Sequence, residues 1–117
     1  MKNTALAARV MAHVEHLAAD PTGPDRWSQN VWGVETDCGT LACFAGWTVM
    51  LADGPEGFDE AARTGTIPPR ACELLGVEYN GAEEALLFFD TAVDPDRLRE
   101  TVESVFGKLP AVETATI

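Results

Sequence analysis

An uncharged stretch from Leu41 to Ala52 contains no proline and is apolar on every side of a helical projection. A helix that is apolar all round is a buried helix. Its length of roughly 12 residues is well short of the about 20 that a membrane span needs. We therefore predict a central helix over about residues 40–52, capped by Asp37 or Thr40 and ended by the sequence Asp53-Gly54-Pro55.

Amphipathic patterns before and after this stretch predict further helices. Residues 4–19 place apolar side chains and one histidine on a single face: Leu6, Val10, His13, Val14 and Leu17. Asp94 followed by Pro95 is typical of a helix start, and a similar stripe continues to Leu109. Shorter helices are expected over 68–75 and 82–90.

These elements predict a mostly or wholly α-helical protein. We expect a small single-domain bundle of four to six short helices around the buried central helix, spanning residues 1–110. Residues 111–117 are small, polar or β-branched and predict a loose C-terminal tail.

Two segments show no clear period. Residues 25–37 contain two tryptophans, which predicts a loop packed over the core, with Gly33 at a tight turn. The stretch 53–67 is undecided, with one or two helical turns anchored by Phe58. Gly46 interrupts the central helix at a cost of about 1 kcal/mol relative to alanine, so another helix or the tryptophan-bearing loop is expected to approach it closely.

The predicted helix 82–90 is apolar over more than one face, since Leu86 to Phe89 are four consecutive large apolar residues. A helix packed on one core uses a stripe a little over 100° wide. We assign Leu86 and Phe89 to the core. Leu87 or Phe88 is then left for a second surface, either the far side of the central helix or the interface of a homodimer.

The charge of the chain narrows the choice of partners. Its 117 residues include 19 acidic and 8 basic ones, for a net charge of −11. Such a surface disfavours direct binding to nucleic acid or anionic membranes, because phosphate contacts require Lys and Arg. It permits a basic protein partner, or mimicry of nucleic acid if the carboxylates form one contiguous face.

Three cysteines, an odd number, favour reduced thiols and a cytoplasmic protein. Arg9, His13 and Glu15 interrupt the N-terminal apolar residues, so we expect no signal peptide. Residues Cys38-Gly39-Thr40 superficially match a thiol-protease nucleophile, but the two histidines, His13 and His16, both precede it. We therefore predict no catalytic residues.

A zinc site built from the two histidines, Cys38 and Cys43 is also disfavoured. The two cysteines are five residues apart, whereas zinc ligands are usually closer. His13 lies within an apolar stripe, where a core histidine is the commoner outcome. The sequence thus predicts neither a metal nor a cofactor.

The motifs above resemble those of a family of small proteins found in actinobacteria and their phages. The shared frame runs through nearly the whole chain: Gln29, Trp32-Gly33, Cys38-Gly39-Thr40, Cys43, Ala45-Gly46-Trp47, Ala71-x-x-Leu74-Leu75-Gly76, Leu87-Phe88 and the Leu98 helix. The resemblance implies a fold unit and a phage or mobile-element setting, with no established activity. We take its central residues as the candidate ligand or motif core: Trp32, Gly33, Cys38, Gly39, Thr40, Cys43, Gly46 and Trp47.

Two functions remain open at this point, besides the nucleic-acid mimicry considered above. The favoured one is a non-enzymatic cytoplasmic protein-interaction module, which in a phage would act on a host factor. The alternative is a thiol-, metal- or small-ligand-binding protein that uses Cys38, Cys43, His13 and the region of Trp32 and Trp47.

Overall fold

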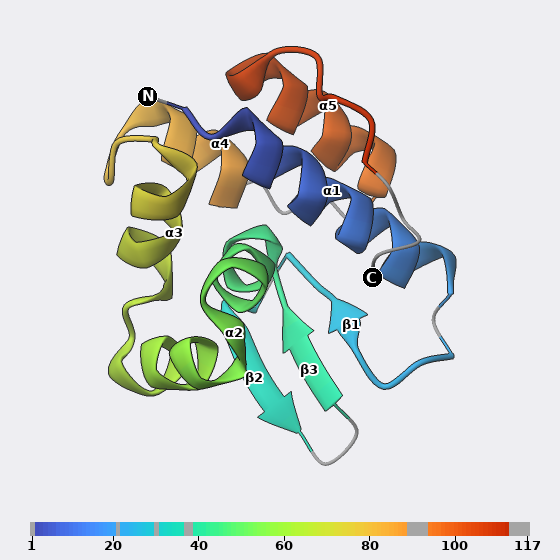
Figure 1. Cartoon of the computed structure of the whole chain (residues 1–117), viewed down its shortest axis with the longest axis vertical. Coiled ribbons are helices and arrows are strands. Elements are labelled where there is room, and N and C mark those ends of the chain that lie inside the picture. The colour runs from blue at the N-terminus through green and yellow to red at the C-terminus, as the bar shows by residue number, and fades with distance from the viewer. Residues whose placement is uncertain (1, 21, 30, 37–38, 89–93, 113–117) are drawn as a thin grey trace.

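The computed structural model describes residues 2–20, 22–29, 31–36, 39–88 and 94–112, which form a mostly α-helical domain with a small sheet (Figure 1). The predicted helical fold is confirmed. Its elements, in chain order, are α1 (Thr4–Ala19), β1 (Arg26–Trp27), β2 (Gly33–Thr36), β3 (Gly39–Ala42), α2 (Phe44–Thr64), α3 (Ile67–Leu75), α4 (Ala82–Phe88) and α5 (Pro95–Phe106). The end of the predicted tail, 113–117, lies outside the described residues.

The first and last helices match their predictions and lie side by side (Figure 1). Each is capped locally, because the Asn3 side chain accepts the N–H of Leu6 and the Asp94 side chain accepts the N–H of Asp96. Arg99 donates two hydrogen bonds to the Glu15 carboxylate, at 2.7 and 2.8 Å. A bidentate ion pair therefore joins α1 to α5.

A three-stranded sheet replaces the loop predicted over 25–37, and that prediction is wrong. Strand β3 is central, with β1 parallel on one side and β2 antiparallel on the other. Thr40 and Ala42 are buried, while Gly39 and Leu41 are half-buried, which is the two-residue alternation of a strand. Strands of two to four residues are too short to show this period in the sequence.

The central helix therefore begins later than predicted, at Phe44, because the residues before it pair in β3. Thr40 lies in that strand and Asp37 lies outside the described residues, so the expected cap is not observed. Cys43 occupies the N-cap position without a capping side-chain hydrogen bond.

Gly54 and Pro55 kink α2 instead of ending it. Gly54 has φ 81° and ψ 177°, and the chain then resumes as helix up to Thr64. Phe58 in this second half is fully buried, as its predicted role as an anchor requires. Asp53, just before the kink, accepts two hydrogen bonds from Arg70 on α3, at 2.7 and 2.8 Å.

The orientation of α4 is the reverse of the prediction. Leu86 is 50% exposed, whereas Leu87 and Phe88 are buried within the single chain. The assignment of Leu86 to the core is wrong, and so is the choice of Leu87 and Phe88 as interface residues, because neither reaches the surface. Phe89 lies outside the described residues, and the argument for a homodimer loses its basis.

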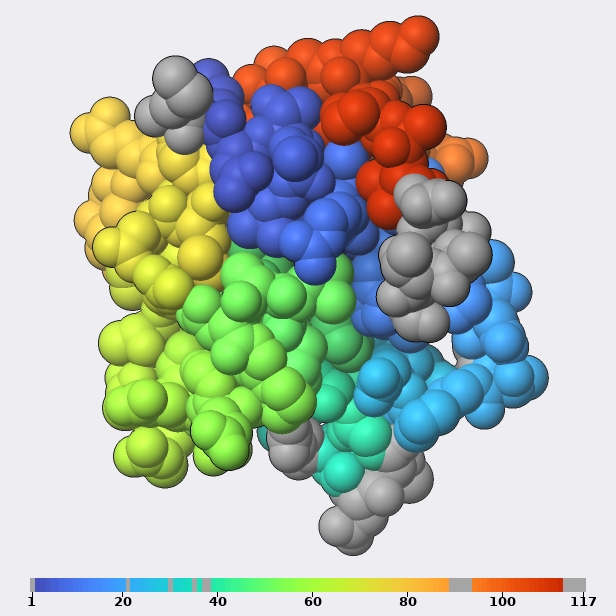
Figure 2. Space-filling model, in the orientation of Figure 1, coloured from blue at the N-terminus to red at the C-terminus, as the bar shows by residue number. Residues whose placement is uncertain are grey.

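The core lies between α1, the first half of α2 and α5, and extends to α3 and α4. In the space-filling view, residues of the strands come to the surface below α2, on the side away from α1 and α5 (Figure 2). Within the described residues, no helix is both long and apolar enough to cross a membrane.

Candidate functional site

Most of the motif core gathers where the strands meet the start of α2. Gly46 packs directly on the backbone beside Trp32, since a Cβ on Gly46 would lie 2.1 Å from the Trp32 carbonyl oxygen and 2.7 Å from the Ala42 Cβ. This is the close approach of the tryptophan-bearing segment that the sequence predicted. The motif glycine is therefore explained by packing.

The two strand glycines also serve close contacts. Gly33 lies in β2, not at the predicted tight turn, and a Cβ there would meet the Phe58 ring at 2.6 Å. Gly39 has φ +125°, which strongly favours glycine, and it lies against the backbone of Pro24. The neighbouring Thr40 donates its N–H to the Asp25 carboxylate at 2.9 Å.

The thiol of Cys43 is buried and unsuited to nucleophilic chemistry. Only 1% of the residue is exposed, and burial raises the pKa of the thiol to about 11. Its sulfur lies 3.7 Å from the Trp32 carbonyl oxygen. Cys38, the other predicted motif cysteine, lies outside the described residues.

The structure shows two side-chain contacts within the predicted thiol and ligand cluster. Cys43 contacts Trp32, while His13 meets Trp47 edge-on, with ring centroids 4.7 Å apart and planes inclined by 66°. Trp47 is buried and donates its indole N–H to the Arg26 carbonyl at 3.1 Å. Among the described residues, no group of three or more His, Cys, Asp or Glu side chains could hold a metal ion.

His13 is half-buried, and both of its ring nitrogens are buried without a hydrogen-bond partner. Burial lowers the pKa of the imidazole, an effect that the charge of Asp25 opposes and that of His16 adds to. The ring is therefore held in its neutral form at neutral pH by the apolar surroundings that it shares with Trp47.

Gln29, which was not among the predicted site residues, is the main polar link between these elements. Its side-chain oxygen accepts the Phe44 N–H at 2.8 Å and the Trp27 indole N–H at 3.0 Å. Its side-chain nitrogen donates to the Leu87 carbonyl at 3.1 Å. A lone glutamine has no diagnostic spacing, so its place in the resemblance frame was the only sequence signal for it.

An apolar groove opens beside Trp32, with a volume of about 420 Å³. Its lining combines the segment before β2, the second half of α2 and the start of α3: Val31, Trp32, Gly33, Ala61, Ala62, Gly65, Ile67 and Pro68. The Trp32 ring packs edge-on against Phe88, at a centroid distance of 6.0 Å, yet the residue keeps 37% exposure. The sequence pointed to Trp32 and Gly33 but to none of the lining residues beyond 60.

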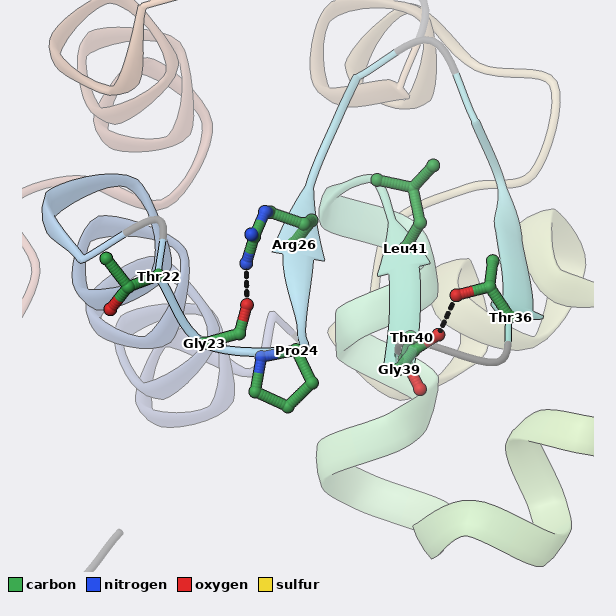
Figure 3. Close-up of a pocket in the computed structure, with 8 residues that line it drawn as sticks. All are labelled: Thr22, Gly23, Pro24, Arg26, Thr36, Gly39, Thr40 and Leu41. Carbon is green, nitrogen blue, oxygen red and sulfur yellow. Dashed lines mark hydrogen bonds between the residues drawn. The ribbon is translucent and has the colours of Figure 1, made fainter.

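Two further hollows include polar side chains in their linings. One of about 490 Å³ lies between β1, β3 and the segment before β1 (Figure 3). There the Arg26 guanidinium donates to the Gly23 carbonyl, and the Thr36 hydroxyl donates to the Gly39 carbonyl at 2.9 Å. The other, of about 670 Å³, is lined in part by Arg70 and Asp53, which pair with each other. In both hollows, polar side chains are already engaged within the chain.

Comparison with known proteins identifies no relative: no protein-family model, no curated protein and no solved structure matches the chain. The site is therefore interpreted from its own geometry.

Proposed function

We propose that this chain is a non-enzymatic protein-interaction module that holds a partner protein at the Trp32 groove. The observation that carries the proposal is the partly exposed indole in a hollow whose other lining residues are all apolar or glycine. Tryptophan is the residue type most enriched among those that dominate binding energy at protein interfaces.

The motif cysteine supports this choice over the thiol alternative. Cys43 is buried beneath Trp32 and its pKa is raised, so the residue acts as part of the packing under the groove. The family resemblance extends the proposal to its setting, a cytoplasmic accessory protein of a phage or mobile element that acts on a host factor.

A capture experiment with matched variants tests the proposal. The immobilised chain, its Trp32→Glu variant and a Tyr79→Glu control are exposed to lysate of the native host, and retained proteins are quantified by mass spectrometry. Tyr79 is an aromatic residue that is 50% exposed away from the groove. Thermal melting first establishes that all three proteins are folded.

We expect at least one protein to be retained by the parent and by Tyr79→Glu, and to be roughly tenfold depleted on Trp32→Glu. If Trp32→Glu retains every protein in the same amount as the parent does, the groove is not the binding site and the proposal fails.

A further inference from the structure

We infer that Asn80 is a site of spontaneous deamidation, which converts it to aspartate or isoaspartate and weakens the attachment of α4. The reaction consumes water alone and is independent of the Trp32 groove. Three features of the turn before α4 carry the inference: the glycine that follows Asn80, the exposed amide of Asn80, and the bond from its backbone to a buried carboxylate.

The reaction joins the side chain of Asn80 to the backbone of Gly81. The Gly81 nitrogen attacks the side-chain carbonyl carbon, a new N–Cγ bond forms, and the amide nitrogen leaves as ammonia with the proton of the glycine nitrogen. Water then opens the cyclic imide. Opening at Cγ gives aspartate, and opening at the backbone carbonyl gives isoaspartate, in which the main chain runs through the former side chain.

The turn presents both reacting groups at the surface. Asn80 has φ 65°, in the left-handed region that asparagine enters more readily than most residues, and it is exposed. No described residue bonds to its side-chain amide. Gly81 has no side chain to shield its nitrogen. Its N–H donates to the Glu78 carbonyl at 3.1 Å, a turn bond that must open before the attack, and turns at the surface open more readily than core helices.

Asn3 is the opposite case in the same chain. It is also exposed, but its side-chain oxygen accepts the Leu6 N–H and its side-chain nitrogen donates to the Leu74 carbonyl at 3.4 Å. The next residue is Thr4, whose stiff β-branched side chain crowds the attacking nitrogen. Asn3 therefore separates the effect of the Asn80 turn from the effect of exposure.

The reaction has a structural consequence because Asn80 is bonded to a buried acid. Its backbone N–H donates to the Glu84 carboxylate at 3.1 Å, and Glu84 is only 2% exposed. The other oxygen of this carboxylate accepts the Cys72 thiol of α3 at 3.3 Å. Isoaspartate lengthens the backbone inside the loop that the bond from Asn80 to Glu84 closes. The bond is then lost, and a buried carboxylate oxygen is left without its donor.

Peptide mass spectrometry of the folded chain tests the reaction. The chain is kept at mildly alkaline pH until a free peptide of residues 76–86 has reacted completely, and fragmentation by electron transfer then distinguishes isoaspartate from aspartate. We expect both products at position 80, while Asn3 stays intact. An unchanged Asn80 would show that the folded turn protects it, and equal conversion of Asn3 would show that the turn has no special role. Either result overturns the inference.

Gly81→Ala tests the route of the reaction. A Cβ at this position lies 3.0 Å from the Glu78 carbonyl oxygen and shields the nitrogen, so conversion of Asn80 should slow several-fold. Asn80→Gly suits the positive φ, and it should abolish the ammonia that the parent releases over the same time. Conversion of Gly81→Ala at the rate of the parent, or release of ammonia by Asn80→Gly, contradicts attack on Asn80 by its neighbour.

Thermal melting tests the consequence for α4. The isoaspartate form, separated by chromatography, is compared with the parent and with Asn80→Asp, which adds the charge without lengthening the backbone. We expect Asn80→Asp to melt close to the parent and the isoaspartate form to melt several degrees lower. Hydrogen exchange of the α4 amides should be faster in the isoaspartate form alone. Equal melting and exchange in the isoaspartate form and the parent would contradict the weakened attachment of α4.

Discussion

Two helices of this protein begin in opposite ways. At the start of α5, Asp94 accepts the N–H of Asp96 two residues later, at 2.9 Å. At the start of α2, the N-cap residue Cys43 makes no such bond, and the Phe44 N–H is accepted by Gln29, 15 residues away in the sequence. The N-terminus of α5 is thus capped by a residue of its own segment. The N-terminus of α2 is capped by a residue that only the tertiary structure brings near.

The difference teaches where the stability of the central helix comes from. A local cap contributes about 1 kcal/mol and acts on one helix. The Gln29 amide instead bonds to groups on three elements, and two of these bonds are buried. Removal of the amide leaves the two buried groups without a partner. We therefore expect substitutions at the two helix starts to differ clearly in their effect on the free energy of unfolding.

The largest effect is expected for Gln29→Ala. It leaves the Phe44 N–H, the Trp27 indole N–H and the Leu87 carbonyl without their partner, so the free energy of unfolding should fall by about 3–5 kcal/mol. Urea unfolding followed by circular dichroism measures the change. A loss below about 1 kcal/mol would mean that Gln29 acts as no more than an ordinary cap.

The next effect is expected for Gly46→Ala. In an exposed helix this change would stabilise by about 1 kcal/mol. Here the new methyl group meets the Trp32 carbonyl oxygen, a backbone atom, so we expect a loss of about 2 kcal/mol. Denaturant unfolding decides the sign, and a gain in stability would show that the approach of the two backbones is looser than described.

A smaller effect is expected for the local cap. Asp94→Ala should lower the free energy of unfolding by about 1 kcal/mol, while Asp94→Asn should retain most of it, because asparagine caps helices about as well. The two variants are compared by thermal melting. If Asp94→Ala costs as much as Gln29→Ala, the contrast between the two helix starts does not hold.

The smallest effect concerns pH and the buried imidazole of His13. Its lowered pKa means that the folded protein binds this proton less readily than the unfolded chain does. Stability should therefore fall as the pH drops through the ordinary histidine pKa of 6.5, and continue to fall toward the lower pKa of the folded state. Urea unfolding at pH 7.5 and 5.5 measures the difference, and His13→Phe should reduce it.

His16→Gln is the matched control, because His16 is exposed on the same helix. Equal pH dependence in His13→Phe and in the parent would show that His13 does not carry the effect.

The same contrast between local and distant bonds explains which elements could be predicted from the sequence. Helices α1 and α5 carry complete stripes and local caps, so their spans were predicted closely. The sheet was missed because its strands are short and their polar groups are satisfied by distant residues, such as Asp25 for the Thr40 N–H. The seven-residue α4 is too short for its stripe to define the buried face, so Leu86 was misplaced.

The candidate site was predictable only in part, for a related reason. Trp32 and Gly33 stand out in the sequence, and the close packing on Gly46 follows from the cost of glycine in a helix. The opposite wall of the groove comes from the chain beyond the kink at Gly54, where no period decides the structure. Which small residues line the groove depends on how the chain after Gly54 packs against the segment that contains Trp32.

The Gln29 amide also has a consequence for the order in which the protein comes apart. It bonds to α4 across 58 positions of the sequence and to the first N–H of α2 across 15. Undocking of α4 removes one of the three bonds that hold this amide in place, so we expect the first turn of α2 to open with it. We therefore expect hydrogen exchange at the Phe44 amide to follow exchange in α4, as in one cooperative unit, while α5 frays separately at its own cap.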